Sequence, residues 1–205
     1  MAIRKSGYTS STSKHYVLDA GAIYRNLKYD GTDWNGTLLG ATAEGSTLTI
    51  EQTYRQIEVD GVKVNVKGGK VLETAMASLE ANVKELTAEN YRRAINGTIR
   101  EALPEEAPAG YKVIESKLHV EDSDFDDNIA YVGTLSGTKE PVIIILDNTF
   151  VTSPLEQENA DKAEAVIAMT FEAHASDEQI ENEELPWRIF YPGESTPGEP
   201  APEGV

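Results

Sequence analysis

The sequence contains no cysteine, few basic residues relative to acidic ones, and no long apolar run. Without cysteine, neither a disulfide framework nor a thiolate metal site is possible. Lys and Arg number 18 against 35 Asp and Glu, so the formal net charge is −17. A charge of this sign favours solubility and argues against ordinary binding to DNA or to an anionic membrane. The longest aliphatic run, residues 142–146, is far shorter than a membrane span.

The composition suggests one main domain with two polar ends. The 205 residues, 40% of them hydrophobic, suit a single globular domain, here placed at residues 15–192. Residues 1–14 are rich in Ser and Thr and lack the apolar stretch of a signal peptide, so we expect a flexible arm and synthesis in the cytoplasm. Residues 193–205 are rich in Glu, Pro and Gly, and we expect a disordered acidic tail. The apolar island at residues 185–191 is expected to dock on the domain.

Two unusually long strands are predicted at residues 46–59 and 70–85, because apolar and polar residues alternate there with period two. At about 3.3 Å per residue each strand would span roughly 45–50 Å, whereas ordinary strands have about five or six residues. One chain of this size has few strands long enough to pair along the whole length of such a sheet. Further copies of the same chain are therefore an obvious source of neighbouring strands.

Between these strands lies a short basic segment. Its sequence alternates valine with polar residues and ends in two glycines: Val62, Lys63, Val64, Asn65, Val66, Lys67, Gly68 and Gly69. The pattern is typical of a short amphipathic strand or an extended arm. One interpretation is a solvated hairpin whose lysines protect a sheet edge. The other is an arm that lies on the acidic surface of another subunit.

A helix is predicted over residues 87–103. Thr87 is a good N-cap, Glu89 falls in the first turn, and Leu86 and Tyr91 occupy the hydrophobic-staple positions. Gly97 weakens the middle of this segment and is compatible with an end near residue 96.

The remaining segments favour strands. We expect a strand, a glycine turn and a short second segment in residues 15–27, and strands at 111–120 and 161–176. Residues 129–135 and 140–146 are typical of a hairpin. The fold class is therefore mainly β, with one flanking helix and a long extended hairpin arm.

The motifs that could support chemistry are incomplete. Asp122, Asp124 and Asp126 have the first spacings of a calcium loop, but Asp127 replaces its glycine and Gly133 its final acidic residue. A solvated acidic loop is the favoured interpretation, with a weak cation site as the alternative. The three histidines are far apart and lack the spacing of a metal site. We expect no metal, no cofactor and no enzymatic activity.

The order of long strand, basic arm, second long strand and the helix sequence ELTAENYRRAI resembles the tail tube (major tail) proteins of long-tailed bacteriophages. The phrases GTLLGATAEGSTLTIE (36–51) and FVTSPLEQENADKAEAVIAMTFEAHAS (150–176) add to this resemblance, which covers roughly residues 15–192. It implies a β-sandwich or barrel-like subunit that forms hexameric rings stacked into a tube. It also implies a place in the virion tail as a conduit for DNA ejection. The partners implied are the chain itself and the tape-measure, tail-terminator and baseplate or tip proteins.

In such a tube, duplex DNA passes through the lumen without specific binding. Because DNA carries about one negative charge per 1.7 Å, a lumen ring of basic side chains would hold it back. We therefore expect the polar faces of the long strands to line the lumen. The candidate lumen residues are Glu51, Thr53, Ser78, Glu80, Asn82, Thr170 and Glu172. The alternative is that these are ordinary solvent-facing positions of a sheet.

Two other function classes remain open. One is the tube protein of a contractile tail or secretion-type device, which a neighbouring sheath gene would distinguish. The other is a non-tube β-sandwich module of a virion, or one that binds carbohydrate. Such modules display clustered exposed aromatic residues, whereas Trp34 and Trp187 are far apart in the sequence, and we expect Trp187, Ile189 and Phe190 to pack on the sandwich.

Overall fold

A computed structural model describes residues 6–159 and 161–193, and it is mainly β, as the sequence predicts. The strands are β1 (Val17–Tyr29), β2 (Trp34–Leu38), β3 (Thr42–Gln56), β4 (Lys70–Val83), β5 (Gly97–Glu101), β6 (Lys112–Ser116), β7 (Asp126–Leu135), β8 (Pro141–Val151), β9 (Gln157–Glu158), β10 (Val166–Glu172) and β11 (Trp187–Phe190). The helices are α1 (Ala88–Ala94) and α2 (Asp177–Glu181), with short 3-10 turns at Thr12–Lys14 and Asp122–Asp124.

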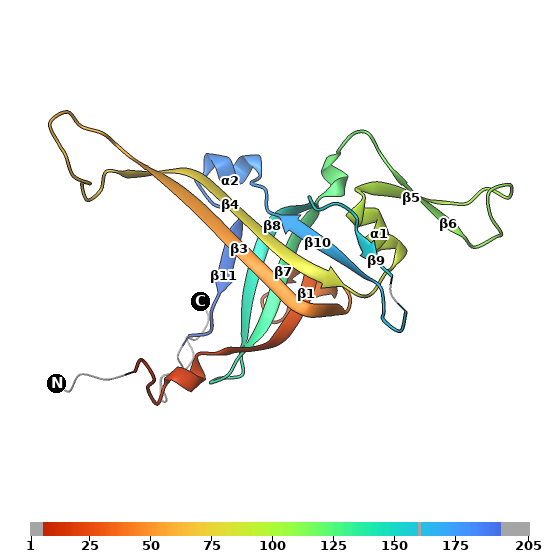
Figure 1. Cartoon of the computed structure of the whole chain (residues 1–205), viewed down its shortest axis with the longest axis horizontal. Helices are drawn as coiled ribbons and strands as arrows, with labels where there is room; N and C mark the ends of the chain where they lie inside the picture. The colour runs from red at the N-terminus through yellow and green to blue at the C-terminus, as the bar shows by residue number, and fades with distance from the viewer. Residues whose placement is uncertain (1–5, 160, 194–205) are drawn as a thin grey trace.

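One large sheet forms a sandwich-like body by folding over on itself (Figure 1). Within the described residues its order is β2-β1-β7-β8-β10-β4-β3, with β11 paired to β8 and β9 to β10. The pairings β1–β7, β7–β8, β10–β4 and β3–β4 are all antiparallel. β5 and β6 form a separate two-stranded sheet that projects from the body beside α1 (Figure 1).

The main core lies between the two halves of this sheet. β4 and β10 contribute every second residue to it, because successive side chains of a strand point to opposite faces. These residues are at most 2% exposed: Ala77, Leu79, Ala81, Val83, Ile167, Met169 and Phe171. Ile23 of β1, Ile129 of β7 and Leu146 of β8 meet them from the other half. The alternation that predicted the second long strand therefore also identified its buried face, whereas β3 has no fully buried residue.

The predicted helix over residues 87–103 is too long, and the alternative end near residue 96 is close to the observed one. α1 stops at Ala94, and residues 97–101 form β5 instead. Asn96 has a left-handed backbone with φ of 48°, a conformation that commonly ends helices. Gly97 then lies against β6, where a Cβ would collide with the carbonyl oxygen of Glu115. Backbone pairing between β5 and β6 replaces helix continuation at this point.

The start of α1 matches the prediction. Thr87 is the N-cap, and its side-chain hydroxyl accepts a hydrogen bond from the backbone N–H of Asn90. Glu89 lies in the first turn, where its negative charge interacts favourably with the positive end of the helix dipole. Leu86 and Tyr91 both pack against the main core.

The glycine turn expected within residues 15–27 is also wrong, because β1 continues through it as one strand. The irregularity is a bulge, since the pairing with β7 shifts register between Leu18 and Ala22. Asp19 and Gly21 both have φ of 72° there. A Cβ on Gly21 would also collide with the ring of Tyr131, so glycine is required by packing as well as by backbone conformation.

The C-terminal part of the described chain docks on the body as expected. Trp187 packs against the main core, and β11 pairs with β8 over Trp187–Phe190. α2, which the sequence analysis did not predict, precedes it and is capped by Ser176. The predicted disordered tail falls outside the described residues beyond position 193, as do residues 1–5 of the predicted N-terminal arm.

Candidate assembly surfaces

The seven candidate lumen residues lie on one face of the sheet formed by β3, β4 and β10. Residues directly opposite each other in an antiparallel pair point to the same face. Across β4 and β10, Glu80 lies opposite Thr170 and Ser78 lies opposite Glu172. Asn82 shares their face because it follows Glu80 by two positions in β4. This face points away from the main core.

The same register extends the polar face onto β3. Glu51 lies opposite Met76, and Thr53 lies opposite Thr74, with 2.6 Å between the two hydroxyl oxygens. The face carries three carboxylates and several hydroxyls, and from residue 47 to 53 of β3 and 74 to 82 of β4 it holds no Lys or Arg. A shallow hollow of about 220 Å³ on this face is lined in part by Glu51, Met76 and Glu172. The face is thus polar and acidic. Whether it faces a lumen stays a prediction.

β3 and β4 continue well beyond the body as a hairpin, which we call the arm (Figure 1). Along its outer half both faces are exposed, in contrast to the root, where one face forms the core. Apolar side chains are exposed on it from both strands: Ile50, Tyr54, Val71, Leu72 and Met76, at 36–51%. β3 is an edge strand, so its outer backbone groups are available to another strand.

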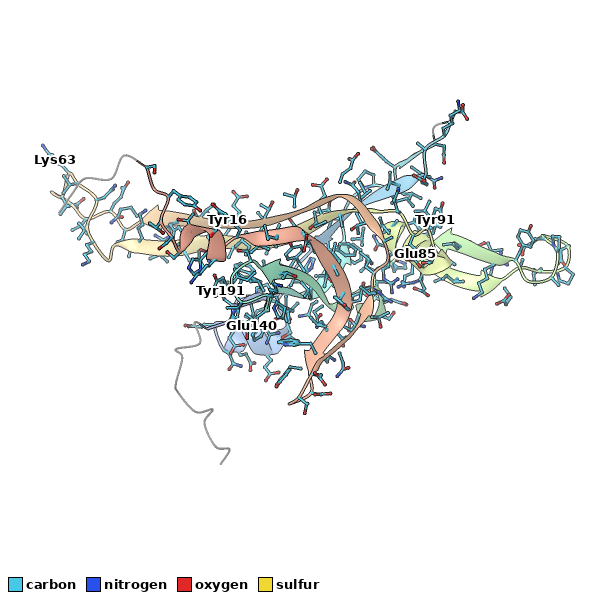
Figure 2. The ribbon with its side chains drawn as sticks, turned by 90° about the horizontal axis from the view of Figure 1, so that it is seen from below. Tyr16, Lys63, Glu85, Tyr91, Glu140 and Tyr191 are labelled. Carbon is cyan, nitrogen blue, oxygen red and sulfur yellow. The ribbon has the colours of Figure 1, made fainter. Side chains whose placement is uncertain are left out.

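The arm tip, residues 57–69, is a loop with turns and contains no strand. The two ends of the tip are joined by a hydrogen bond of 2.7 Å from the Ile57 N–H to the Gly69 carbonyl oxygen. A second hydrogen bond, from the Gly69 N–H to the Val66 carbonyl oxygen, closes a turn. The tip exposes Val62, Val64 and Val66 at 45%, 77% and 46%. An amphipathic strand is therefore wrong for this segment, and an extended arm is correct. Lys63 lies at its far end (Figure 2).

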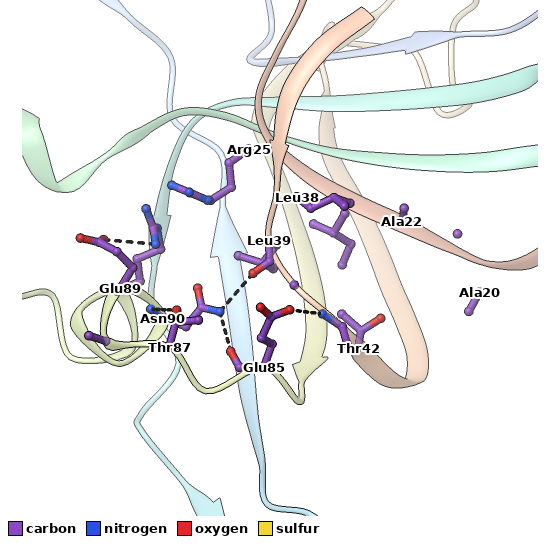
Figure 3. A pocket seen from close by; sticks show the side chains of 16 residues that line it. Ala20, Ala22, Arg25, Leu38, Leu39, Thr42, Glu85, Thr87, Glu89 and Asn90 are labelled. Atoms are coloured by element: carbon purple, nitrogen blue, oxygen red, sulfur yellow. Dashed lines mark hydrogen bonds and ion pairs between the residues drawn. The ribbon is translucent and has the colours of Figure 1, made fainter.

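A hollow of about 860 Å³ lies between β1, the β2–β3 connection and α1 (Figure 3). Asn90, which is 2% exposed, donates from its side-chain amide to the carbonyl oxygens of Leu39 and Glu85. Glu85 in turn accepts a hydrogen bond from the Ala41 N–H. These bonds tie the helix to the start of β3, so the lining of this hollow serves to attach α1 to the sheet.

At one end of this hollow, Arg25 and Arg93 share the carboxylate of Asp126, at 3.3 and 3.1 Å. Arg93 also lies 3.4 Å from Glu89. Burial lowers the pKa of Arg93 and the positive charge of Arg25 adds to this, while the carboxylate of Asp126 opposes the shift. This cluster of charges holds α1 against β7.

The acidic loop at residues 121–127 is ordered by its own chain. Lys117 lies 2.7 Å from Asp124 and 3.0 Å from Glu121. Burial raises the pKa of Asp124, but hydrogen bonds from Lys117 and from the Glu121 N–H outweigh it and leave that pKa below its ordinary value. Within residues 6–159 and 161–193 no group of three or more His, Asp or Glu is arranged to hold a metal ion.

The structure brings together aromatic residues that are far apart in the sequence. The ring of Trp34 lies 5.0 Å from that of Phe190 and 5.4 Å from that of Tyr29. The expectation of no aromatic cluster is therefore wrong. Ile189 and Phe190 dock with β11 on β8 but remain 55% and 41% exposed. The hydrophobic pattern of the strands gave no sign of this, because β2 pairs with β1 and β11 pairs with β8, and only the folded chain brings Trp34 of β2 to Phe190 of β11.

Polar groups beside this aromatic cluster are already paired within the chain. Arg188 contacts the buried carboxylate of Asp147 at 2.8 Å, and Lys28 contacts Asp127 at 2.8 Å. Gln179 of α2 donates a further hydrogen bond to Asp147. The aromatic cluster and these ion pairs together cover the face of β1, β7, β8 and β11 that points away from the main core.

The β5–β6 hairpin is a surface that the sequence analysis missed. The guanidinium of Arg100 holds both Glu106 and Glu115, at 2.7 and 2.9 Å. Leu103 and Tyr111, at the base of the loop that joins the strands, are 50% and 62% exposed. The change from helical to alternating spacing after Asn96 was the signal that could have revealed it.

No helix in the described ranges has the length and apolar character needed to cross a membrane. No family model matches this sequence, and no curated protein matches it. The fold is similar to that of a chain in the tail of an empty GTA particle refined with C6 symmetry, at 11% identity and a TM-score of 0.39, covering 77% of this chain and 92% of that one. It is also similar to a chain of the anti-feeding prophage (AFP) baseplate, at 12% identity and a TM-score of 0.40, covering 85% and 95%.

Proposed function

We propose that this chain is a structural protein of a virion tail that assembles with copies of itself into stacked hexameric rings, the tail tube. The observation that carries the proposal is the arm. Its outer half exposes apolar residues on both faces, and its edge strand has no partner on one side among the described residues. A monomer gains nothing from such a projection, whereas a second copy would bury it.

The polar face gives this assembly a function. With the core on one side of β3, β4 and β10, the opposite face carries Glu51, Glu80 and Glu172 among hydroxyl and amide side chains. Repeated around a ring, this surface forms a channel wall that repels the phosphates of DNA and lets the duplex slide. The sequence resemblance to tail tube proteins supports the same proposal. It adds tape-measure, tail-terminator and baseplate or tip proteins as partners.

The proposal is tested by negative-stain electron microscopy of the purified chain over a range of concentrations. We expect rings or hollow tubes with sixfold end views. A variant in which residues 58–68 are replaced by a two-residue Asn-Gly turn should stay monomeric, because it keeps the body and loses the arm tip. Far-UV circular dichroism and thermal unfolding provide the control, since the variant should fold normally.

Two results would contradict the proposal. If the variant without the arm tip forms the same tubes, the arm has no role in assembly. If the intact chain shows neither tubes nor concentration-dependent association by analytical ultracentrifugation, self-assembly itself is wrong.

A further inference from the structure

We propose that the arm tip of one copy docks on the β5–β6 hairpin of the next copy, in a head-to-tail contact. This inference rests on the proposed self-assembly and names the surface that receives the arm. It is drawn from the placement, the charge and the apolar residues of the two projections.

The two projections lie at opposite ends of the long axis of the molecule. In Figure 1 the arm extends to the left of the body and the β5–β6 hairpin to the right. The perpendicular view agrees, with Lys63 at one end and the β5–β6 hairpin beyond Tyr91 at the other (Figure 2). A copy displaced along this axis therefore presents its β5–β6 hairpin to the arm tip of its neighbour. Such a contact joins different surfaces of the two copies and repeats from copy to copy.

The charges of the two projections are opposite in sign. The arm tip together with Lys70, the first residue of β4, carries three lysines and two carboxylates, and no ion pair involves any of them within the described chain. The β5–β6 hairpin, residues 97–116, carries two cations and four carboxylates. Arg100 occupies Glu106 and Glu115, which leaves Glu101 and Glu105 without an ion pair among the described residues. The basic arm thus meets unpaired carboxylates, and complementary charges fix the register of such a contact.

Apolar surface accompanies these charges on both sides. The arm tip exposes Val62, Val64 and Val66, and residues 56–66 enclose a hollow of about 430 Å³. The hairpin offers Tyr111 at 62% exposure and Leu103 at 50%. A tyrosine ring brings a large apolar area with a polar end, the kind of side chain that anchors interfaces by entering a hollow.

α2 is the competing acidic surface. The segment from residue 177 to 184 carries five carboxylates, and Ile180 within it is 65% exposed. It lies on the arm's side of the body (Figure 1), where Gln179 contacts Asp147 of β8. A neighbour displaced along the long axis presents its β5–β6 hairpin to the arm tip first, and its α2 lies farther away, on the other side of its body. α2 therefore provides a matched control surface.

Because the chain has no cysteine, introduced pairs of cysteines report this contact without background. The probe is the full chain with Val64→Cys and Tyr111→Cys, oxidised under assembly conditions and analysed by non-reducing electrophoresis. We expect a ladder of covalent multimers, since each copy has both halves of a head-to-tail contact. Val64→Cys with Ile180→Cys should give no ladder, and Val64→Cys alone should give at most a dimer.

Charge reversal provides a second, independent measurement. Lys63→Glu with Lys67→Glu should raise the concentration needed for assembly by about tenfold or more, because like charges then meet at the contact. Adding Glu101→Lys and Glu105→Lys should restore assembly. Adding Glu181→Lys and Glu184→Lys in the 177–184 segment instead should not restore assembly.

The outcomes separate this inference from the proposed function. Tubes without a Val64–Tyr111 ladder, or restoration through α2, would overturn the hairpin contact and leave the tube intact. A ladder together with restoration by the hairpin substitutions would establish it. The absence of both tubes and ladder would overturn the inference and the proposed function together.

Discussion

The guanidinium of Arg93 lies 3.1 Å from the carboxylate of Asp126 and joins α1 to the first residue of β7. The two side chains are 7% and 12% exposed, so this ion pair is largely removed from water. Arg25 of β1 contacts the same carboxylate. Asp126 is therefore the shared counter-charge of two largely buried cations, and Arg93 has Glu89 as a further partner at 3.4 Å.

Asp126→Asn should destabilise the protein by about 3 kcal/mol, because it leaves two partly buried guanidinium groups without their shared counter-charge. Urea unfolding followed by tryptophan fluorescence measures the change. The matched control is Glu164→Gln, which removes a carboxylate of similar pairing distance, 3.0 Å from Lys84, but at 79% exposure. That variant should change stability by less than ~1 kcal/mol. Equal unfolding midpoints for the two variants would contradict this role for Asp126.

Glu106 should titrate at an unusually low pH. Hydrogen bonds from Arg100 and from the Leu103 N–H lower its pKa to about 2, from 4.5. A pKa that is lower in the folded state means that ionised Glu106 favours the folded hairpin above pH 4.5, and that this contribution is lost as the pH falls toward 2. Carbon-13 NMR of the side-chain carboxyl measures the midpoint directly.

Arg100→Gln should return the midpoint of Glu106 toward its ordinary value, because it removes the main hydrogen-bond donor. Lys112→Gln removes a charge from the same hairpin without touching Glu106 and should leave the midpoint unchanged. An unchanged midpoint in the Arg100 variant would show that the pair does not form in solution.

Glu80→Lys combined with Glu172→Lys should leave assembly intact but slow or block DNA passage. The two residues lie on one face of the β4–β10 pair, so each ring of six would gain a band of positive charge. The measurement is the rate of genome ejection from particles that carry the variant, with slower ejection at low salt than at high salt. Glu178→Lys with Glu181→Lys makes the same charge change on α2 and should not slow ejection. Unchanged infectivity of the Glu80 and Glu172 variant would count against a lumen role.

Much of the fold follows from local patterns that the sequence displays. Alternation over β4 and β10 identified both the strands and their buried residues, because a half-buried strand exposes every second side chain. Thr87 marked the start of α1, since a capping hydroxyl satisfies backbone groups within the same turn. The same alternation named the seven polar residues that share one face.

Sheet order and register could not be read from the sequence, because they depend on contacts between distant segments. Only the folded chain brings Glu51 of β3 and Glu172 of β10 to the same face, and only the folded chain brings Trp34 of β2 to Phe190 of β11. The helix predicted after residue 94 is replaced by pairing of β5 with β6, in which Gly97 lies opposite Ser116. Local helix propensity gives no information about this contact between separate segments. The sequence by itself determined which residues are buried along β4 and β10. The tertiary structure decided which strands are neighbours, and therefore which surfaces the arm and the polar face present to another copy.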